Sequence, residues 1–427
     1  MAKREIQVDE KLPLLQTVPL SLQHLFAMFG STVLVPILFK VDPATILLFN
    51  GIGTLFYLLI CKGRIPAYLG SSFAFISPVF AVLSKYDYSA ALGGFIITGL
   101  IFSVVALLIG VVGTKWIDVV FPPAAMGAIV AVIGLELAPI AAQMAGLASA
   151  DPTVPYVADP KVITVSMFTL GVTILGNIIF RGFLAIIPIL VGVVSGYILA
   201  LFMGLVNTEA IANAGWLASP TIYHPTFNID AMMIIVPAAL VVIAEHVGHL
   251  FVTSNIVGRD LSKNPGLHRS LLGNGISTMF SGFFGSTPNT TYGENIGVMA
   301  LTKVYSTWVI GGAAIFAIIL SFVGKLSAAI QSIPTPVMGG VSLLLFGVIA
   351  ASGIRMLVEA KVDYSKASNL ILTSIVLIIG VSGAQIQLGV VSLKGMGLAT
   401  VVAIILSIFF RLLEKTNLSN ETESGKH

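Results

Sequence analysis

A few ionisable residues of this sequence lie inside long apolar runs, where a charged side chain is rarely found. Glu245 and His249 stand four residues apart in the run 231–256, so they lie on one face of a helix. Glu294 directly follows a break rich in Gly, Thr and Pro in the run 286–301. Since a charge at the centre of a bilayer costs about 2.5–3.5 kcal/mol on insertion scales, each of these residues is predicted to have a function.

Two carboxylates within a membrane can bind a cation or accept hydrogen bonds. A hard cation needs many oxygen ligands, and no third carboxylate stands near these two. Zinc could be held by His246, His249 and the glutamates, but no H-E-x-x-H spacing occurs. A neutral heterocycle fits better, because carboxylates accept its N–H groups while free backbone N–H groups donate to its carbonyls. Phe73 and Tyr292 could stack on its faces, so we predict a small uncharged ring and no metal.

These residues also have structural interpretations. Glu245 and His249 could form a hydrogen-bonded pair that holds two spans together. Glu294 could simply cap the N-terminus of a helix, where a negative charge is favourable. His246 and His24 are as consistent with packing as with function.

The composition places these residues in a membrane protein. Of the 427 residues, 56% are hydrophobic and 10% are charged, and the mean hydropathy is +1.00. This leaves too little polar surface to cover a soluble globule. The basic residues are scattered singly between apolar runs, so no nucleic-acid partner is expected.

Fourteen apolar runs are candidate membrane spans, because a helix needs about 20 apolar residues to cross a bilayer. They lie near residues 17–39, 43–60, 66–84, 89–112, 121–148, 161–180, 182–205, 231–256, 268–284, 286–301, 304–324, 334–354, 367–385 and 393–413. We therefore predict an all-α polytopic membrane protein with 14 transmembrane segments. The third and tenth runs are crowded with Gly, Ser, Thr and Pro, and are predicted to be interrupted by short extended segments.

Three short motifs recur in the same order and at similar spacings, which indicates an internal repeat. The motif N-G-I-x-T-x-F recurs from Asn50 to Asn274, and two shorter motifs recur from Gly70 to Gly285 and from Pro122 to Pro334. We predict two seven-span repeats, 17–205 and 231–413, joined by an extracytoplasmic loop, 206–230. Seven is odd, so the repeats are inverted, and such folds bind substrate where interrupted spans meet near the midplane.

The basic residues predict how the chain is oriented. An even number of spans puts both termini on one face, and only five of the 22 Lys and Arg residues fall on the other: Lys40, Lys85, Lys161, Lys325 and Lys394. Because cytoplasmic loops are rich in Lys and Arg, we expect both termini, 1–16 and 414–427, to be cytoplasmic.

The sequence E-N-I-G-V-M-A-L-T-K at 294–303 resembles the signature motif of the nucleobase/ascorbate transporter family, and Gln23-His24 resembles the Q-H pair of its first span. The likeness covers nearly the whole chain, including A-E-H-V-G-H at 244–249. It implies a core domain that holds substrate, a gate domain that dimerises, and short strands in the two interrupted spans. It also implies symport of a nucleobase such as uracil with protons across the bacterial cytoplasmic (inner) membrane, with no other cofactor.

The resemblance implies roles at matching positions. Glu245 and Glu294 would hydrogen-bond the base, His249 would support Glu245 and take part in proton coupling with both carboxylates, and the backbone at Phe73 and Gly293 would contact the ring. Further candidates for the substrate site are Ser72, Tyr292, Gln23, His24, Ser31, Ser342 and Asn295. Ser31 and Phe346 depart from the family pattern, which has a small apolar residue and a tyrosine there.

Other functions stay open on the sequence. A proton-coupled purine transporter, for xanthine or uric acid, would need a wider pocket. An ion channel would need a continuous polar path, and an intramembrane enzyme would need a nucleophile with a base; the sequence contains neither pattern.

Overall fold

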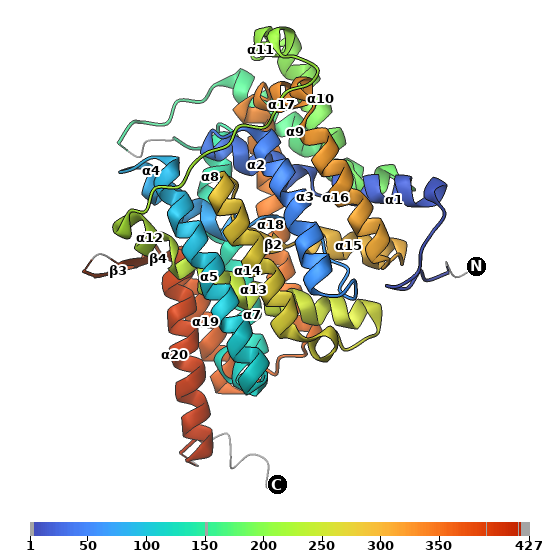
Figure 1. Cartoon of the computed structure of the whole chain (residues 1–427). Helices are drawn as coiled ribbons and strands as arrows, with labels where there is room; N and C mark the ends of the chain where they lie inside the picture. The colour runs from blue at the N-terminus through green and yellow to red at the C-terminus, as the bar shows by residue number, and fades with distance from the viewer. Residues whose placement is uncertain (1–3, 150–152, 390, 417, 420–427) are drawn as a thin grey trace.

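The computed structural model describes residues 4–149, 153–389, 391–416 and 418–419. The elements of the first half are α1 (Leu14–Ala27), α2 (Phe29–Phe39), α3 (Pro43–Ile60), β1 (Leu69–Ser71), the 3-10 turn η1 (Phe73–Phe75), α4 (Ile76–Leu83), α5 (Tyr88–Val112), α6 (Lys115–Val120), α7 (Pro123–Glu136), α8 (Ala138–Met144), α9 (Pro160–Ile179), η2 (Leu184–Ile186) and α10 (Pro188–Phe202). Figure 1 shows the whole chain.

The second half begins with short helices, and its last element is a long helix that ends at Lys415. Its elements are α11 (Glu209–Asn213), α12 (Ile229–Ile235), α13 (Pro237–Val257), the π-helical turn η3 (Ser262–Gly266), α14 (Leu267–Phe284), β2 (Asn289–Thr291), α15 (Gly293–Thr302), α16 (Thr307–Ser321), α17 (Gly324–Gln331), α18 (Thr335–Glu359), α19 (Ala367–Val381), β3 (Gln385–Leu388), β4 (Val391–Lys394) and α20 (Gly395–Lys415). Each of the fourteen predicted apolar runs contains at least part of a helix.

Many of these helices are suited to lipid. Among the described residues, seven helical segments are long and apolar enough to cross a membrane, and the pair α1 and α2, bent by 40°, makes an eighth. Four further apolar helices are shorter. Large apolar side chains such as Val111 and Phe202 are exposed on the outside of the molecule, as expected where a helix faces lipid. The chain is therefore a multi-pass membrane protein.

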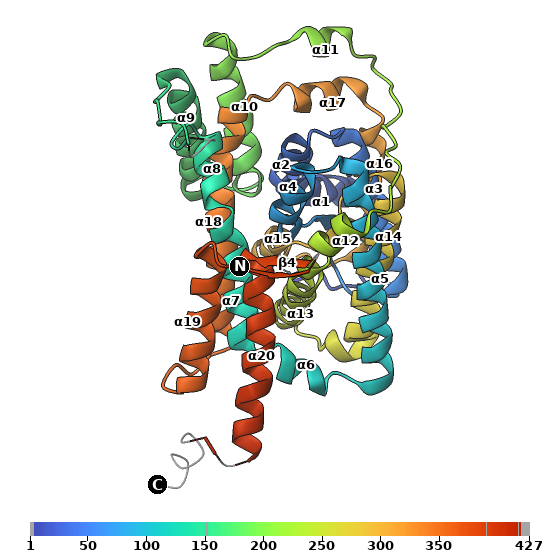
Figure 2. The same cartoon turned by 90° about the vertical axis from the view of Figure 1, so that its left-hand side faces the viewer.

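The helices form two groups, which lie side by side in Figure 2. The first group contains α1 to α5 and α12 to α16, and the second contains α7 to α10 and α18 to α20. In the first group α3 packs on α16 and α14 packs on α5; in the second, α18 packs on α7 and α9. Helix α13 lies at the boundary, because it also contacts α7 and α20.

Two short strands pair inside the first group. In the antiparallel pair β1 and β2, Leu69 lies opposite Thr291 and Ser71 lies opposite Asn289. This confirms the short strands predicted in the third and tenth runs. Each strand satisfies backbone groups of the other, which allows extended chain to lie inside a membrane protein.

The recurring N-G-I-x-T-x-F motif ties each strand to a helix. The hydroxyl of Thr54 on α3 accepts the N–H of Leu69 at 2.9 Å, and that of Thr278 on α14 accepts the N–H of Asn289 at 3.1 Å. Both contacts join the motif threonine to the first residue of a strand. The same local structure is therefore built twice.

The helix boundaries agree with two of the three motif matches. Helices α3 and α14 begin at equivalent places relative to Asn50 and Asn274, and α7 and α18 each begin directly after the matched prolines, Pro122 and Pro334. The predicted equivalence of Gly70 with Gly285 is wrong, because Gly70 is the middle residue of β1 whereas Gly285 precedes β2.

Gly285 instead ends α14. It adopts a left-handed conformation with a φ of 94°, which glycine reaches readily because it has no Cβ. The residue at the middle of β2 is Thr290, and it lies directly opposite Gly70 in the strand pair. The equivalence of the two strands therefore follows from their position after the motif threonine, and not from a shared glycine.

Two features near α20 were not expected from the sequence. The strands β3 and β4 form a hairpin between α19 and α20, in a segment that lies mostly between the apolar runs 367–385 and 393–413. Glu136, the last residue of α7, accepts the backbone N–H of Met396 at 2.6 Å. The carboxylate thus caps the N-terminus of α20 from another helix, a favourable position for a negative charge.

Candidate substrate site

Two predicted site residues on α13 face strand β2. The hydroxyl of Thr290 donates to Oε2 of Glu245 at 3.3 Å, and the hydroxyl of Thr291 lies 3.2 Å from Nδ1 of His249. Consecutive threonines thus hold Glu245 and His249, one turn apart on their helix. Each of the two residues is therefore bonded to the strand.

The third predicted residue, Glu294, lies in the first turn of α15, which is separated from β2 by Tyr292 alone. Its Oε1 is buried and has no hydrogen-bond partner in the described part of the chain. Helix α15 also packs on α13, so Glu294 and Glu245 lie on neighbouring helices. A buried carboxylate oxygen without a partner is one that a bound hydrogen-bond donor would satisfy.

Two helix N-termini meet at the strand pair. Helix α15 starts at Gly293 and the turn η1 starts at Phe73, and neither has a side-chain cap. The first N–H groups of a helix have no partner within that helix, so they can donate to a ligand. The site therefore offers both hydrogen-bond acceptors and donors.

Aromatic rings surround Phe73. Its ring centroid lies 6.0 Å from that of Tyr292 and 5.9 Å from that of Phe346, both in edge-to-face geometry. The hydroxyl of Tyr292 donates to the carbonyl of Ser71, so this side chain also braces β1. Phe346 belongs to α18, in the second helix group, which places the site at the boundary between the groups.

Three other predicted residues are buried serines. The backbone N–H of Ser72 donates to the carbonyl of Pro288 at 2.9 Å, and its hydroxyl has no partner in the described part of the chain. The hydroxyl of Ser31 donates to the carbonyl of Met28 at 3.0 Å within its own helical segment. Ser342, on α18, also has a buried hydroxyl without a partner among the described residues.

The predicted residues of α1 lie beside α15. Helix α1 packs on α15, and both His24 and Asn295 are buried, each 1% exposed. Gln23 has a buried side-chain oxygen with no partner in the described ranges. These residues therefore lie where α1 packs against the helix that carries Glu294.

His246, which the sequence left open, takes part in a separate buried network. Its Nε2 lies 2.8 Å from the hydroxyl of Ser270, which lies 2.6 Å from the hydroxyl of Tyr57. This network joins α13 to α14 and α3. The contacts favour the packing interpretation of His246.

Sequence reasoning missed three residues that shape the site. Thr290 and Thr291 were recognised only as part of an extended segment, although their position directly before Tyr292 and Glu294 was a usable signal. Phe346 was noted only as a departure from a family pattern. Nothing in its local sequence indicates that it reaches Phe73, since that contact depends on how α18 packs.

The arrangement can bind a small polar ring. Within the described ranges, no three His, Cys, Asp or Glu side chains are grouped to hold a metal ion. A multi-span fold with a polar site at the boundary between two helix groups defines the protein class of a membrane permease.

Comparison with known proteins agrees with this class. A family model described as "Permease family" matches residues 15–389, so the chain belongs to this family. Two similar curated proteins are a uracil permease of Escherichia coli K12, 68% identical over 97% of this chain and 95% of its own length, and a uracil permease of Paenibacillus larvae, 65% identical over 99% and 100%. A uracil permease of Bacillus subtilis 168 is 49% identical over 92% of each chain.

These findings confirm the resemblance to the nucleobase/ascorbate transporter family. The family and its relatives are permeases, which confirms the prediction of a transporter over that of an enzyme.

Solved structures support the fold. The transmembrane domain of the cyanobacterial bicarbonate transporter BicA is 15% identical with a TM-score of 0.63, over 94% of this chain and 100% of that domain. The structure of SLC26A9 is 12% identical with a TM-score of 0.69, over 94% of this chain and 66% of that protein. At such identities the likeness concerns the fold alone.

Proposed function

We propose that this chain imports uracil together with protons across the cytoplasmic membrane of a bacterium. The observation that carries the proposal is the convergence of Glu245, Glu294 and two uncapped helix N-termini at the β1–β2 pair. Uracil is a flat, uncharged ring with N–H donors and carbonyl acceptors. The carboxylates accept its N–H groups, and the free backbone N–H groups donate to its carbonyls.

The substrate-binding residues are Glu245, Glu294, Phe73, Tyr292, Gly293 and Ser72. Phe73 and Tyr292 supply the apolar walls of the pocket, and edge or face contacts with aromatic rings add to the area that a flat base buries. Ser31, Ser342, Gln23, His24 and Asn295 complete the surroundings of the site. The names of the relatives, uracil permeases at 65–68% identity, support uracil over the purines xanthine and uric acid.

Proton coupling follows from the charges gathered at this site. Two carboxylates on the neighbouring helices α13 and α15 disfavour each other's ionisation, so proton uptake there and base binding are linked. His249, held by Thr291, lies one turn from Glu245 and takes part in this exchange. A membrane potential contributes about 2.3 kcal/mol per proton for each 100 mV, which is sufficient to concentrate a neutral base.

The proposal includes the architecture. Fourteen spans form two inverted repeats, with both termini in the cytoplasm. The first helix group is the core domain that holds substrate, and the second is the gate domain, through which two copies form a homodimer. Movement of one group against the other exposes the site to each side of the membrane in turn.

The test is uptake of radiolabelled uracil by cells that lack their own permease, at pH 5.5 and pH 8, with and without a protonophore. We expect saturable uptake that is faster at pH 5.5 and collapses with the protonophore. Uptake that the protonophore leaves unchanged would overturn proton coupling. A well-expressed protein that takes up xanthine or uric acid and not uracil would overturn the substrate assignment.

A further inference from the structure

The segment Glu5–Glu10, here called the N-terminal strap, crosses the molecule next to the end of α15. Ile6 pairs with Val304 in a parallel β-bridge, although the two residues lie in opposite halves of the chain. In Figure 1 the N-terminal segment lies beside α15, on the opposite side of the first helix group from α5. The strap precedes every candidate membrane span, yet it is attached to the second half of the chain.

Backbone hydrogen bonds fix the strap in place. The N–H of Ile6 donates to the carbonyl of Lys303 at 2.9 Å, and the N–H of Tyr305 donates back to Ile6 at 2.8 Å. The N–H of Thr307 donates to the carbonyl of Val8 at 3.1 Å. Two alternate residues of the strap, Ile6 and Val8, are thus bonded to the connection between α15 and α16 and to the first residue of α16.

One apolar side chain of the strap is completely buried. Val8 is 0% exposed and packs in a small cluster with Val257, Ile296, Met299 and Tyr305. Val257 is the last residue of α13, while Ile296 and Met299 belong to α15. Val8 therefore fills the space between the two helices that carry Glu245, His249 and Glu294.

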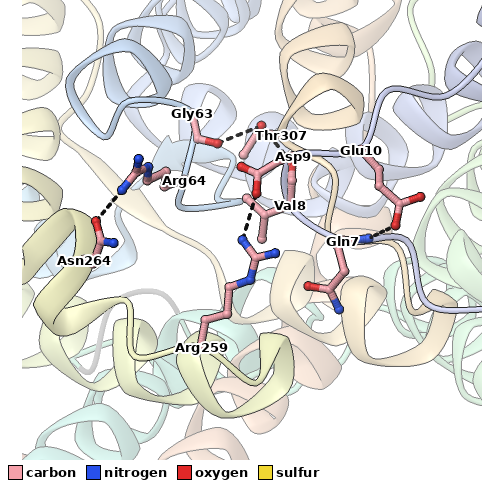
Figure 3. Close-up of polar contacts among 9 residues, drawn as sticks. All are labelled: Gln7, Val8, Asp9, Glu10, Gly63, Arg64, Arg259, Asn264 and Thr307. Atoms are coloured by element: carbon pink, nitrogen blue, oxygen red, sulfur yellow. Dashed lines mark hydrogen bonds and ion pairs between the residues drawn. The ribbon is translucent and has the colours of Figure 1, made fainter.

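Ion pairs join the strap to the same two helix ends. Asp9 lies 2.9 Å from Arg259, just beyond the end of α13, and Glu5 lies 2.8 Å from Lys303, just beyond the end of α15. Figure 3 shows the pair of Asp9 with Arg259. All four side chains are partly exposed, so each pair contributes little by itself.

The loop after α3 is attached to the strap as well. The hydroxyl of Thr307 lies 3.0 Å from the carbonyl of Gly63 and 3.2 Å from that of Val8, as Figure 3 shows. The strap thereby links the ends of α3, α13 and α15. These are the helix of the first N-G-I-x-T-x-F motif and the two helices with the candidate acidic residues.

We propose that the N-terminal strap positions the substrate site by holding the ends of α13 and α15 in register. Helix α15 has ten residues, so its N-terminus with Glu294 lies about 15 Å from the strap, at 1.5 Å per residue. A helix this short moves as a rigid rod, and a shift at one end displaces Glu294 relative to Glu245. The inference rests on the proposed function for the roles of Glu245 and Glu294 and for the choice of uracil as the ligand.

The first test compares Val8→Asp with Val8→Ile in the purified full-length protein. Val8→Asp puts a charge into the apolar cluster, and we expect it to raise the Kd for uracil at least tenfold, because small displacements of positioned groups are costly to binding. Val8→Ile keeps the apolar contact and is expected to stay within twofold. A folded, monodisperse Val8→Asp protein with unchanged Kd would overturn the proposal.

The second test does not depend on Val8→Asp folding. Asp9→Arg and Arg259→Asp should each raise the Kd for uracil about two- to fivefold, the range expected of an exposed ion pair, and the double variant should restore it. The matched control is Arg411→Glu, which breaks the exposed pair of Arg411 with Glu414, 2.7 Å apart on α20. Single variants that match the control, or a double variant that restores nothing, would count against the strap.

Hydrogen exchange distinguishes this proposal from the proposed function. If the unaltered protein binds no uracil, the substrate assignment fails, and the strap is judged by exchange instead. Arg259→Asp should then speed backbone exchange in 293–302 relative to the unaltered protein, while Arg411→Glu should not. Equal rates of backbone hydrogen exchange in 293–302 in all three proteins would overturn the proposed role of the strap.

Discussion

The two strand-and-helix units of the site share a scaffold and differ in chemistry. Each strand is bound by a motif threonine, Thr54 or Thr278, and each is followed at once by an uncapped helix N-terminus. The first unit then presents Phe73, and the second presents Glu294. The same local frame is therefore built twice, while the side chains on it decide which hydrogen bonds each unit can make.

The helices that pack against the two strands also differ in the polar side chains that they carry. Strand β1 packs against α2, whereas β2 packs against α13. Helix α2 carries Ser31, whose hydroxyl bonds to a carbonyl of its own helical segment, while α13 carries Glu245 and His249, which bond to the strand. The ionisable residues that face the strands thus lie on the second half of the chain.

The largest effect on uracil binding is expected when a carboxylate of the second unit loses its charge. Glu294→Gln and Glu245→Gln preserve size and abolish charge, so each should raise the Kd for uracil about ten- to a hundredfold, as for loss of a charged hydrogen bond worth about 1.5–3 kcal/mol. Isothermal titration calorimetry would measure this. Unchanged affinity in either variant would show that the acidic half is not where the base binds.

Because the two units have the same scaffold, equivalent substitutions in them should reduce thermal stability equally. Thr54→Val and Thr278→Val each leave a strand N–H unpaired, which costs about 1–3 kcal/mol, so both should lower the melting temperature by similar amounts. The control is Thr164→Val, because that hydroxyl bonds only to the carbonyl of Pro160 in its own helix. A loss in one half alone would break the equivalence of the two units.

The aromatic half should contribute less to binding than the acidic half. Phe73→Ala removes ring contacts worth about 0.5–1.5 kcal/mol, which predicts a rise in the Kd for uracil of about two- to tenfold. Phe73→Leu serves as the control, because it retains apolar bulk without the ring. An effect of Phe73→Ala as large as that of Glu294→Gln would reverse the order proposed for the two halves.

A carboxylate outside the site should have little effect on transport. Glu136→Gln weakens a helix-terminus interaction of about 0.3–1 kcal/mol. The interaction is with α20 and does not involve β1 or β2. We expect uracil uptake within twofold of the unaltered protein, with a slightly lower melting temperature. A large loss of uptake would show that Glu136, a carboxylate of the second helix group, takes part in transport.

The strap should act in the same way at both assay pH values. Its hydrogen bond with Glu5 raises the pKa of Lys303 above the usual lysine value. A raised pKa means that the contact is fully present below the ordinary lysine range and is lost only as the pH rises through that raised value. Lys303→Gln should therefore change the Kd for uracil by the same small factor at pH 5.5 and pH 8; a factor that differs would tie the strap to proton coupling.

Local patterns were sufficient to indicate several residues and both strands of the candidate site. Glu245 and His249 were recognised from their helical spacing in an apolar run, and the broken third and tenth runs became β1 and β2 because Gly, Ser, Thr and Pro disfavour a continuous helix there. The match of Gly70 to Gly285 failed, because similarity of a few small side chains does not define a strand register. The hairpin of β3 and β4 was missed, since most of its residues lie in the connection between two apolar runs, for which no strand was predicted.

The sequence by itself determined the membrane class, the ionisable residues inside apolar runs and the places where two helices break, because hydropathy and backbone preference are local properties. Only the tertiary structure decided which residues meet. The contacts of Thr291 with His249, of Phe346 with Phe73 and of Val8 with the ends of α13 and α15 join residues far apart in the chain or on different elements. Such contacts depend on how helices pack, and no single stretch of sequence contains that information.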